Sequence, residues 1–149
     1  MTKQTKDQIS TSIHLEIPFY DVDSYRIVWH GNYPKYFEIA RCALLEKIGY
    51  SYQRMEETNC FFPVIDLQIR YIKAIKFKQN ISIQATLESW QNKLLINYLI
   101  RDSDNNEKLT KGSTTQVAVL MPEQITQYET PKELVQKVHA LRTELQKCD

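Results

Sequence analysis

The sequence predicts one α+β domain in which an antiparallel sheet wraps around a single long helix. Its 149 residues suit one domain with one sizeable core. The strongest helical pattern, at residues 33–48, follows one strand-like segment and precedes four more. Turn-forming residues after the third of these later strands favour a hairpin and therefore antiparallel pairing. A helix with a broad apolar face must be covered, and the sheet is the element that covers it.

The first strand is indicated by apolar residues that alternate with polar or small ones. The apolar members are Ile13, Leu15, Ile17 and Phe19. We expect residues 1–11 to form a polar tail and residues 12–149 to form the domain with its C-terminal helix. Residues 21–30 break the alternation and are interpreted as a loop.

The long helix follows that loop. Its apolar residues recur at helical spacing, at Tyr36, Phe37, Ala40, Ala43, Leu44 and Ile48. Asn32 is the expected N-cap, and Pro34 suits the first turn because a missing N–H costs little there. Gly49 is the expected terminator. Residues 51–57 are expected to add a short helical turn.

The later strands are predicted at about residues 64–71, 81–87, 95–100 and 108–120. Residues 102–106 are dense in turn formers and predict a hairpin between the last two strands, and Met121-Pro122 ends the last one. A terminal helix is expected to begin with Thr130 as N-cap, Pro131 first and Glu133 third. Its narrow apolar stripe places it at a periphery or a subunit contact. The open sheet edges favour dimerisation.

Composition argues against several classes of function. The net charge is +1, from 19 basic and 18 acidic residues, so no global field favours nucleic acid or an anionic membrane. Three scattered glycines exclude a P-loop and a dinucleotide fingerprint, and three isolated histidines suggest no metal site, so no cofactor is expected. No apolar run is long enough to span a bilayer, the N-terminal segment is polar, and three distant cysteines suggest no disulfides. These features predict a cytoplasmic protein.

The segment before the long helix carries the candidate chemistry. Asp21 and Asp23 lie two residues apart, just before a helix N-terminus with unpaired N–H groups and a partial positive charge. Such a terminus can polarise a carbonyl, and a nearby carboxylate can attack it or activate water against it. Acyl transfer needs only those two parts. An aspartate at this position is also commonly a cap or a turn former.

A longer pattern around this segment resembles a known family. The matching residues are Asp21, Asp23, Ile27, Val28, Trp29, His30, Tyr33, Tyr36, Phe37, Glu38, Ala40 and Arg41, with residues 111–117 resembling the last core strand. The pattern resembles the 4-hydroxybenzoyl-CoA thioesterase family and the YbgC-type acyl-CoA thioesterases. It covers about residues 13–120 and implies the hotdog fold and thioesterase activity.

The resemblance also implies roles for individual residues. Asp23 corresponds to the catalytic carboxylate, either as a nucleophile or as a general base. The backbone N–H of His30 faces the thioester carbonyl, and its side chain either orients water or substrate or is a packed loop histidine. Trp29, Gly31 and Tyr33 are expected to bind substrate, and Tyr33 also to pack. Asp21 is expected to structure the loop by bonding nearby N–H groups.

Arg26 departs from the pattern, because the family usually has glycine there. Arg26 either lines the rim of the acyl pocket or points to solvent, which leaves the acyl specificity open. Glu38 and Arg41, three residues apart on the helix, are expected to form an ion pair at a helix surface or interface. A basic cluster suits either a CoA phosphate or an acidic carrier protein, or is simply a solvated strand end. Its members are Arg70, Lys73, Lys76 and Lys78.

Two classes of function remain in competition. The runs 28–33 and 41–45 look closest to hotdog thioesterases of aryl-polyene pigment clusters, which implies an acyl carrier protein thioester rather than an acyl-CoA as substrate. The second class is a non-hydrolytic thioester-binding or dehydratase-like module of an aryl-polyene or fatty-acid-type synthase. The family resemblance further implies a homodimer with active sites between subunits, paired into a homotetramer.

Overall fold

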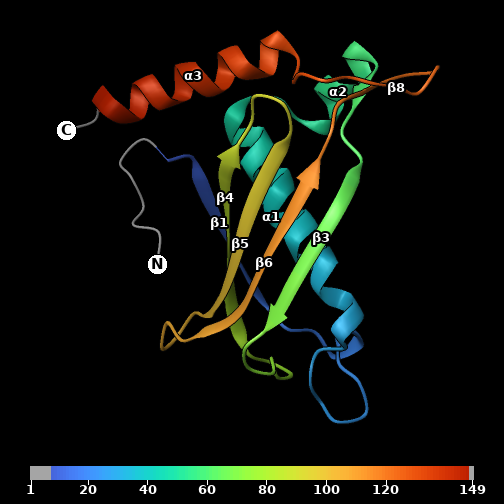
Figure 1. Ribbon diagram of the computed structural model, residues 1–149. Helices are drawn as coiled ribbons and strands as arrows, with labels where there is room; N and C mark the ends of the chain where they lie inside the picture. The colour runs from blue at the N-terminus through green and yellow to red at the C-terminus, as the bar shows by residue number, and fades with distance from the viewer. Residues whose placement is uncertain (1–7, 148–149) are drawn as a thin grey trace.

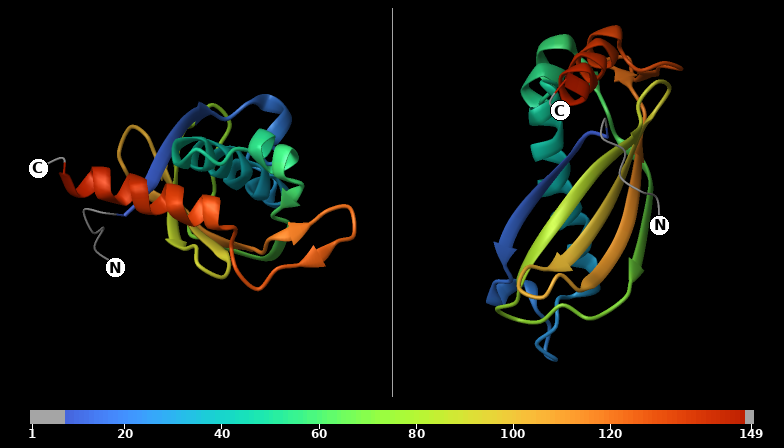
Figure 2. Two further views of the ribbon diagram at one scale, coloured as in Figure 1. Left: turned by 90° about the horizontal axis from the view of Figure 1, so that it is seen from above. Right: turned by 90° about the vertical axis from the view of Figure 1, so that its left-hand side faces the viewer.

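The computed structural model describes residues 8–147, and its largest layer is a five-stranded sheet that curves around helix α1 (Tyr33–Ile48) (Figures 1 and 2). The strands are β1 (Ser10–Glu16), β3 (Val64–Tyr71), β4 (Asn80–Ser89), β5 (Leu94–Asp102) and β6 (Lys108–Gln116). Their order in space is β1-β4-β5-β6-β3, and every pairing is antiparallel. The predicted α+β hotdog architecture is confirmed.

The sheet is not a simple meander. Strands β4, β5 and β6 are joined by hairpins, and the predicted turn at residues 102–106 is present, with Asp102 Oδ1 accepting from the N–H groups of Asp104 and Asn105. In contrast, β3 pairs with β6 at one edge, while β4 lies next to β1 near the other. The connection between β3 and β4 therefore crosses the end of the sheet, on the side where α1 begins (Figure 1).

The core lies between α1 and the inner face of the sheet. Phe37 on α1 stacks against Tyr98 on β5 with ring centroids 4.4 Å apart and an interplanar angle of 8°. A Cβ on Gly112 of β6 would come within 2.4 Å of the Phe37 ring, so the absence of a side chain there lets the helix approach. Ala40 and Leu44 continue the buried face of α1, as its apolar spacing predicts.

The ends of the first strand differ from prediction. β1 begins at Ser10, so the last residues of the predicted tail belong to the sheet, and Ile9 is already buried. Residues 1–7 of that tail lie outside the described residues. Phe19 is 74% exposed in a short 3-10 turn, η1 (Phe19–Asp21), so its predicted place in the strand pattern is wrong. Pro18 explains the change, because a residue without an N–H cannot continue the ladder.

A second, smaller sheet was not predicted. It contains β2 (Cys60–Phe61), β7 (Val119–Leu120) and β8 (Ile125–Thr126), in the order β2-β7-β8. The predicted strand 108–120 is therefore divided, because β6 ends at Gln116 and the chain joins this second sheet. The short helical turn is confirmed as α2 (Tyr52–Thr58), which Ser51 caps by accepting from the Arg54 N–H.

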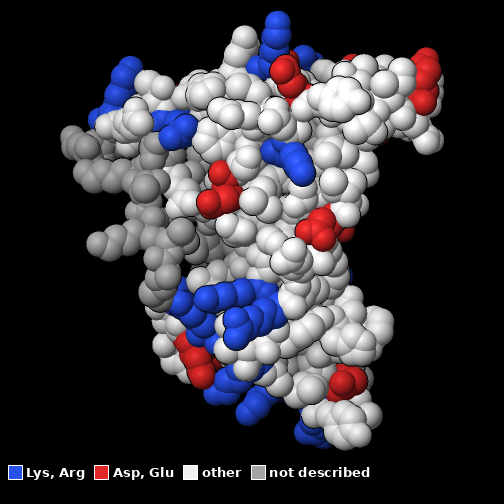
Figure 3. All heavy atoms as spheres, viewed as in Figure 1, with Lys and Arg blue, Asp and Glu red and all other residues white. Residues whose placement is uncertain are grey.

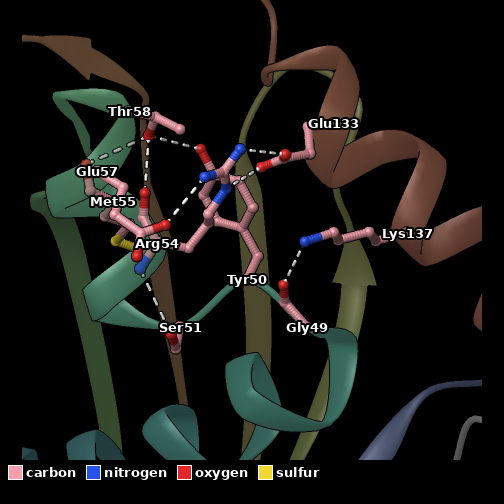
Figure 4. A network of polar contacts seen from close by, with 9 residues as sticks. All are labelled: Gly49, Tyr50, Ser51, Arg54, Met55, Glu57, Thr58, Glu133 and Lys137. Carbon is pink, nitrogen blue, oxygen red and sulfur yellow. Dashed lines mark hydrogen bonds and ion pairs between the residues drawn. The ribbon is translucent and has the colours of Figure 1, made fainter.

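Helix α3 (Lys132–Lys147) lies across the end of the domain, where polar contacts hold it to α2 and to the end of α1 (Figure 4). Arg54 of α2 donates to both carboxylate oxygens of Glu133 at 2.6 and 2.9 Å, and Lys137 donates to the Gly49 carbonyl at 2.6 Å. The helix starts at Lys132, one residue later than the predicted Pro131. The predicted N-cap is not formed, because the Thr130 hydroxyl has no hydrogen-bond partner within residues 8–147. Among the described residues, no helix combines the length and apolar character needed to cross a membrane.

Candidate active site

The segment that contains Asp23 is a tight turn closed by a β-bridge between Val22 and Val28. The Asp23 N–H donates to the Ile27 carbonyl at 2.9 Å, and Oδ1 of its side chain accepts from the Tyr25 N–H at 2.8 Å. Its second carboxylate oxygen has no donor among the residues that the structure describes. One oxygen of Asp23 is thus held by the turn, and the other is available for chemistry.

Arg26 lies at the tip of this turn with a φ of 63°, in the left-handed region that glycine favours. This backbone conformation is the physical reason why glycine suits the position. The Arg26 side chain is exposed and does not line the pocket described below, and its carbonyl accepts from the Phe77 N–H. The predicted role of Arg26 at the pocket rim therefore gains no support from its position in this chain.

Asp21 is the anchor of the loop. It is 3% exposed, and its carboxylate accepts from Lys35 Nζ at 2.5 Å and from the Tyr36 hydroxyl at 2.7 Å. Burial and this hydrogen bond to Asp21 raise the pKa of Tyr36, so its phenol stays protonated. The side chain of Asn32 donates to the Asp21 carbonyl and does not cap α1. Both carboxylate oxygens of Asp21 are thus engaged in structure, which agrees with its predicted role, although its partners are side chains rather than backbone N–H groups.

Two consecutive backbone N–H groups are free where the chain enters α1 through a 3-10 turn, η2 (His30–Asn32). The N–H groups of Val28 and Trp29 donate to the carbonyls of Ile75 and Asp21. Within residues 8–147, those of His30 and Gly31 find no acceptor. They lie at the N-terminal end of a 16-residue helix, where the helix dipole favours negative charge.

The ring of Trp29 lies over Gly31. A Cβ at Gly31 would come within 2.3 Å of this ring, so a larger residue would displace Trp29. The ring is half exposed and also contacts the imidazole of His30, with centroids 5.1 Å apart. Neither Trp29 nor Gly31 lines the pocket, so they shape the entry to the helix rather than its wall.

The turn and the helix start border a pocket of about 270 Å³, the Asp23 pocket. Its predicted members are Asp23, His30 and Tyr33. The structure adds the segment 71–74, which begins at the end of β3 and of which the sequence indicated only Lys73, as a member of the basic cluster. No signal in the sequence pairs this segment with the loop, since the contact depends on how β3 ends in space. The Tyr71 hydroxyl donates to the His30 carbonyl at 2.8 Å and so fixes the 3-10 turn.

Two tyrosines form one side of the pocket. The rings of Tyr33 and Tyr71 meet edge to face, with centroids 4.7 Å apart. Tyr33 is buried, as predicted, and burial raises the pKa of its phenol. Lys73 also borders the pocket, but its ammonium is paired with Glu107 at 3.0 Å. The pocket wall therefore combines apolar aromatic surface with a neutralised cation.

The predicted ion pair between Glu38 and Arg41 is wrong, since no carboxylate lies within 4.0 Å of Arg41 in the described part of the chain. Arg41 is 6% exposed and donates to the hydroxyls of Tyr52 and Tyr98, at 3.2 and 3.4 Å, while Glu38 is exposed. The Arg41 side chain therefore points into the helix–sheet interface.

No group of three or more metal-ligating side chains is found among the described residues.

Comparison with protein families and curated proteins gives a consistent result. The model of the thioesterase-like superfamily matches residues 17–138. The chain is 29% identical over 76 residues to YneP of Bacillus subtilis, which is named as a proposed acyl-CoA thioesterase; the match covers 51% of this chain and 55% of YneP. It is 29% identical over 100 residues to a proposed esterase of Synechocystis, covering 62% and 57% of the two chains. The matches thus span little more than half the length of these relatives.

Solved structures share the fold over nearly the whole chain. DHNA-CoA thioesterase from Staphylococcus aureus has a TM-score of 0.79 at 24% identity, over 93% of this chain and 91% of that one. A 4-hydroxybenzoyl-CoA thioesterase variant in complex with 4-hydroxybenzoyl-CoA has a TM-score of 0.77 at 14% identity, over 87% and 99% of the two chains. At these identities the likeness establishes the fold.

Proposed function

Since the chain belongs to the thioesterase-like superfamily, we propose that it hydrolyses acyl thioesters, with Asp23 as its catalytic carboxylate. The observation that carries this proposal is the free oxygen of Asp23 in the pocket that His30 also lines, at the entry to α1. His30 and Gly31 contribute free N–H groups there. A carboxylate together with two unpaired donors is the minimum that acyl transfer requires.

The proposed reaction begins with the thioester carbonyl oxygen against the N–H groups of His30 and Gly31. These donors stabilise the negative charge that develops on that oxygen. Asp23 either attacks the carbonyl carbon, expelling the thiolate and leaving a mixed anhydride that water hydrolyses, or takes a proton from a water molecule. In the second case the water oxygen bonds to the carbonyl carbon, the C–S bond breaks, and the departing thiolate is protonated to the free thiol. The imidazole of His30 is exposed beside the pocket and is placed to orient that water.

We propose an acyl-CoA as the substrate class. The named function of YneP and of the aryl-CoA thioesterases with the same fold supports this proposal. Tyr33 and Tyr71 offer aromatic surface to an acyl group, and Trp29 is half exposed at the entry to α1.

The finer proposal is a conjugated aryl acyl chain carried by an acyl carrier protein, as in aryl-polyene synthesis. It is tested by presenting one acyl group on both donors, and a large preference for CoA would exclude the carrier-protein version.

We also propose a homodimer formed along β3, with a dimer of dimers as the larger assembly. β3 is an edge strand, and it exposes Val64, Ile65 and Leu67 by 42%, 57% and 41%. An edge with unpaired backbone groups and apolar side chains is suited to pairing with another chain. The Asp23 pocket lies at the end of this strand and is smaller than the roughly 300–1,000 Å³ usual for ligand sites, so a second chain would complete it.

We place the protein in the cytoplasm, where the free thiols of Cys42 and Cys60 would stay reduced.

The experiment that tests the activity compares Asp23→Asn with wild type on a panel of acyl-CoA thioesters, with released thiol as the readout. We expect kcat to fall by at least about 100-fold, because general-base or nucleophilic contributions are of that order or larger. Asp104→Asn is the matched control, since Asp104 is an exposed aspartate in the hairpin turn after β5, away from both the pocket and the β3 edge. Unchanged hydrolysis by Asp23→Asn would instead favour a non-hydrolytic binding module.

A further inference from the structure

The outer face of the sheet, opposite α1, contains a groove of about 680 Å³ (the outer-face groove). Lys and Arg side chains gather on this face over the lower parts of β5 and β6 (Figure 3). Four basic residues line the groove, together with amide side chains. They are Arg70, Arg101, Lys108 and Lys111, with Gln84 and Asn97 beside them. The basic residues come from three strands, so only the folded sheet brings them together.

The strand register makes this arrangement unusual. Arg70 of β3 lies directly opposite Lys111 of β6, and Arg101 of β5 lies directly opposite Lys108 of β6. Two like-charged pairs thus occupy neighbouring rows of one sheet face. Like charges in directly opposed positions destabilise a sheet. The free protein therefore carries an electrostatic cost that an anionic ligand would remove.

No ion pair neutralises the four basic side chains of the groove in the described part of the chain. Within residues 8–147, no carboxylate lies within 4.0 Å of these four side chains, and Arg101 donates only to the Asn106 carbonyl. Glu88 also lines the groove, but it accepts from Asn97 and Gln8. Lys73, two residues past the end of β3, provides a contrast, because it pairs with Glu107. The predicted basic cluster is therefore divided, and only Arg70 of that cluster lines the groove.

We propose that the outer-face groove binds a small organic molecule that carries two or more phosphate groups, such as a nucleotide. Guanidinium forks and ammonium groups are the usual protein partners of phosphate oxygens, and neighbouring amides add hydrogen bonds. The volume of the groove lies in the range of small-molecule sites. A concave site of this size favours a small polyanion over an extended protein or nucleic-acid surface.

This site is separate from the Asp23 pocket. Arg70 and Tyr71 are consecutive on β3, so their side chains point to opposite faces of the sheet. Arg70 lines the outer-face groove and Tyr71 lines the Asp23 pocket. The inference holds whether or not Asp23 is catalytic. The phosphates have two possible sources: a free nucleotide, or the nucleotide portion of a CoA that bends around the end of the sheet.

The test is calorimetric titration of the full chain with ATP and with adenosine 3′,5′-diphosphate. The variant Arg70→Gln/Lys111→Gln removes one like-charged pair, and Lys93→Gln/Lys132→Gln removes the same charge from exposed positions outside the groove. We expect the groove variant to weaken binding at least about tenfold and the control variant to change it less than about twofold. The groove variant should also melt at a higher temperature, which shows that it is folded.

The two sources give different outcomes. Tight binding of adenosine 3′,5′-diphosphate that CoA competes away identifies the nucleotide portion of CoA, whereas tighter ATP binding that CoA does not affect identifies a separate nucleotide. Repeating the titration with Asp23→Asn separates this site from the proposed activity, because nucleotide affinity should not change. The proposal is overturned if wild type binds neither nucleotide, if both variants lose affinity equally, or if only a long oligonucleotide or an acidic protein binds at the groove.

Discussion

At the scale of single residues, Arg26 tests whether the Asp23 turn is strained. A left-handed backbone costs a residue with a side chain about 1–2 kcal/mol, and glycine avoids that cost but loses more freedom on folding. Arg26→Gly should therefore change the free energy of unfolding by between zero and about +1 kcal/mol. Arg26→Val should lower it by about 1 kcal/mol or more, because a β-branched residue is least tolerated there. Urea unfolding midpoints measure both. A Gly variant less stable than the Val variant would contradict the argument.

The two aspartates show how far sequence reasoning reaches. Spacing alone made both of them candidates, and the family pattern favoured Asp23. The structure supplies the physical difference. Asp21 is buried with both oxygens bound by Lys35 and Tyr36, whereas one oxygen of Asp23 has no donor within residues 8–147. The hydrogen bond from the Tyr71 hydroxyl to the His30 carbonyl could not be predicted. It depends on where the edge strand β3 ends relative to a loop about 40 residues earlier in the chain.

At the scale of elements, the docking of α3 depends on the half-buried carboxylate of Glu133. The hydrogen bonds from Arg54 lower the pKa of Glu133 below its ordinary value of 4.5. A carboxyl whose folded-state pKa is depressed stabilises the docked helix above the unfolded pKa, and the contribution is lost as pH falls through the folded pKa. Amide exchange in α3, corrected for intrinsic rates, should therefore accelerate below about pH 4.5 relative to the sheet.

The matched variants for this prediction lie on the same helix. Glu133→Gln should accelerate exchange in α3 already at neutral pH and remove most of the extra acceleration at low pH. Glu144→Gln changes an exposed carboxyl farther along the helix and should behave as wild type. Equal pH responses in all three proteins would show that Leu134 and Val138, which are buried, hold the helix without help from the ion pair.

Elements were predicted well where the signal is local and poorly where it is not. The long helix, its glycine terminator and the hairpin at 102–106 match their predictions, because each follows from residues within a few positions. The division of the strand at Gln116 and the separation of β3 from β4 were not predicted. Both depend on pairings between distant segments, for which alternation of apolar residues contains no information.

At the scale of the whole molecule, the two faces of the sheet suggest how copies of the chain assemble. The outer face carries the four basic residues of the outer-face groove, so stacking two sheets through this face would oppose like charges. The β3 edge instead exposes the apolar side chains of Val64, Ile65 and Leu67, and the strand ends beside the Asp23 pocket. These features support the proposed dimer at the β3 edge, and they argue against pairing of dimers through the groove.

Substitution at this edge tests the assembly together with the activity. Ile65→Lys places a charge on β3 at a side chain that is 57% exposed in the single chain, and Ile125→Lys is the control, at 54% exposure on β8. We expect wild type and the control to have at least twice the mass of the 17.6 kDa chain by light scattering. Ile65→Lys should shift toward the monomer and lose thioesterase activity in parallel, since a charge at the centre of an apolar contact is desolvated without a partner. A fully active monomeric wild type would instead mean that the Asp23 pocket is complete in one chain.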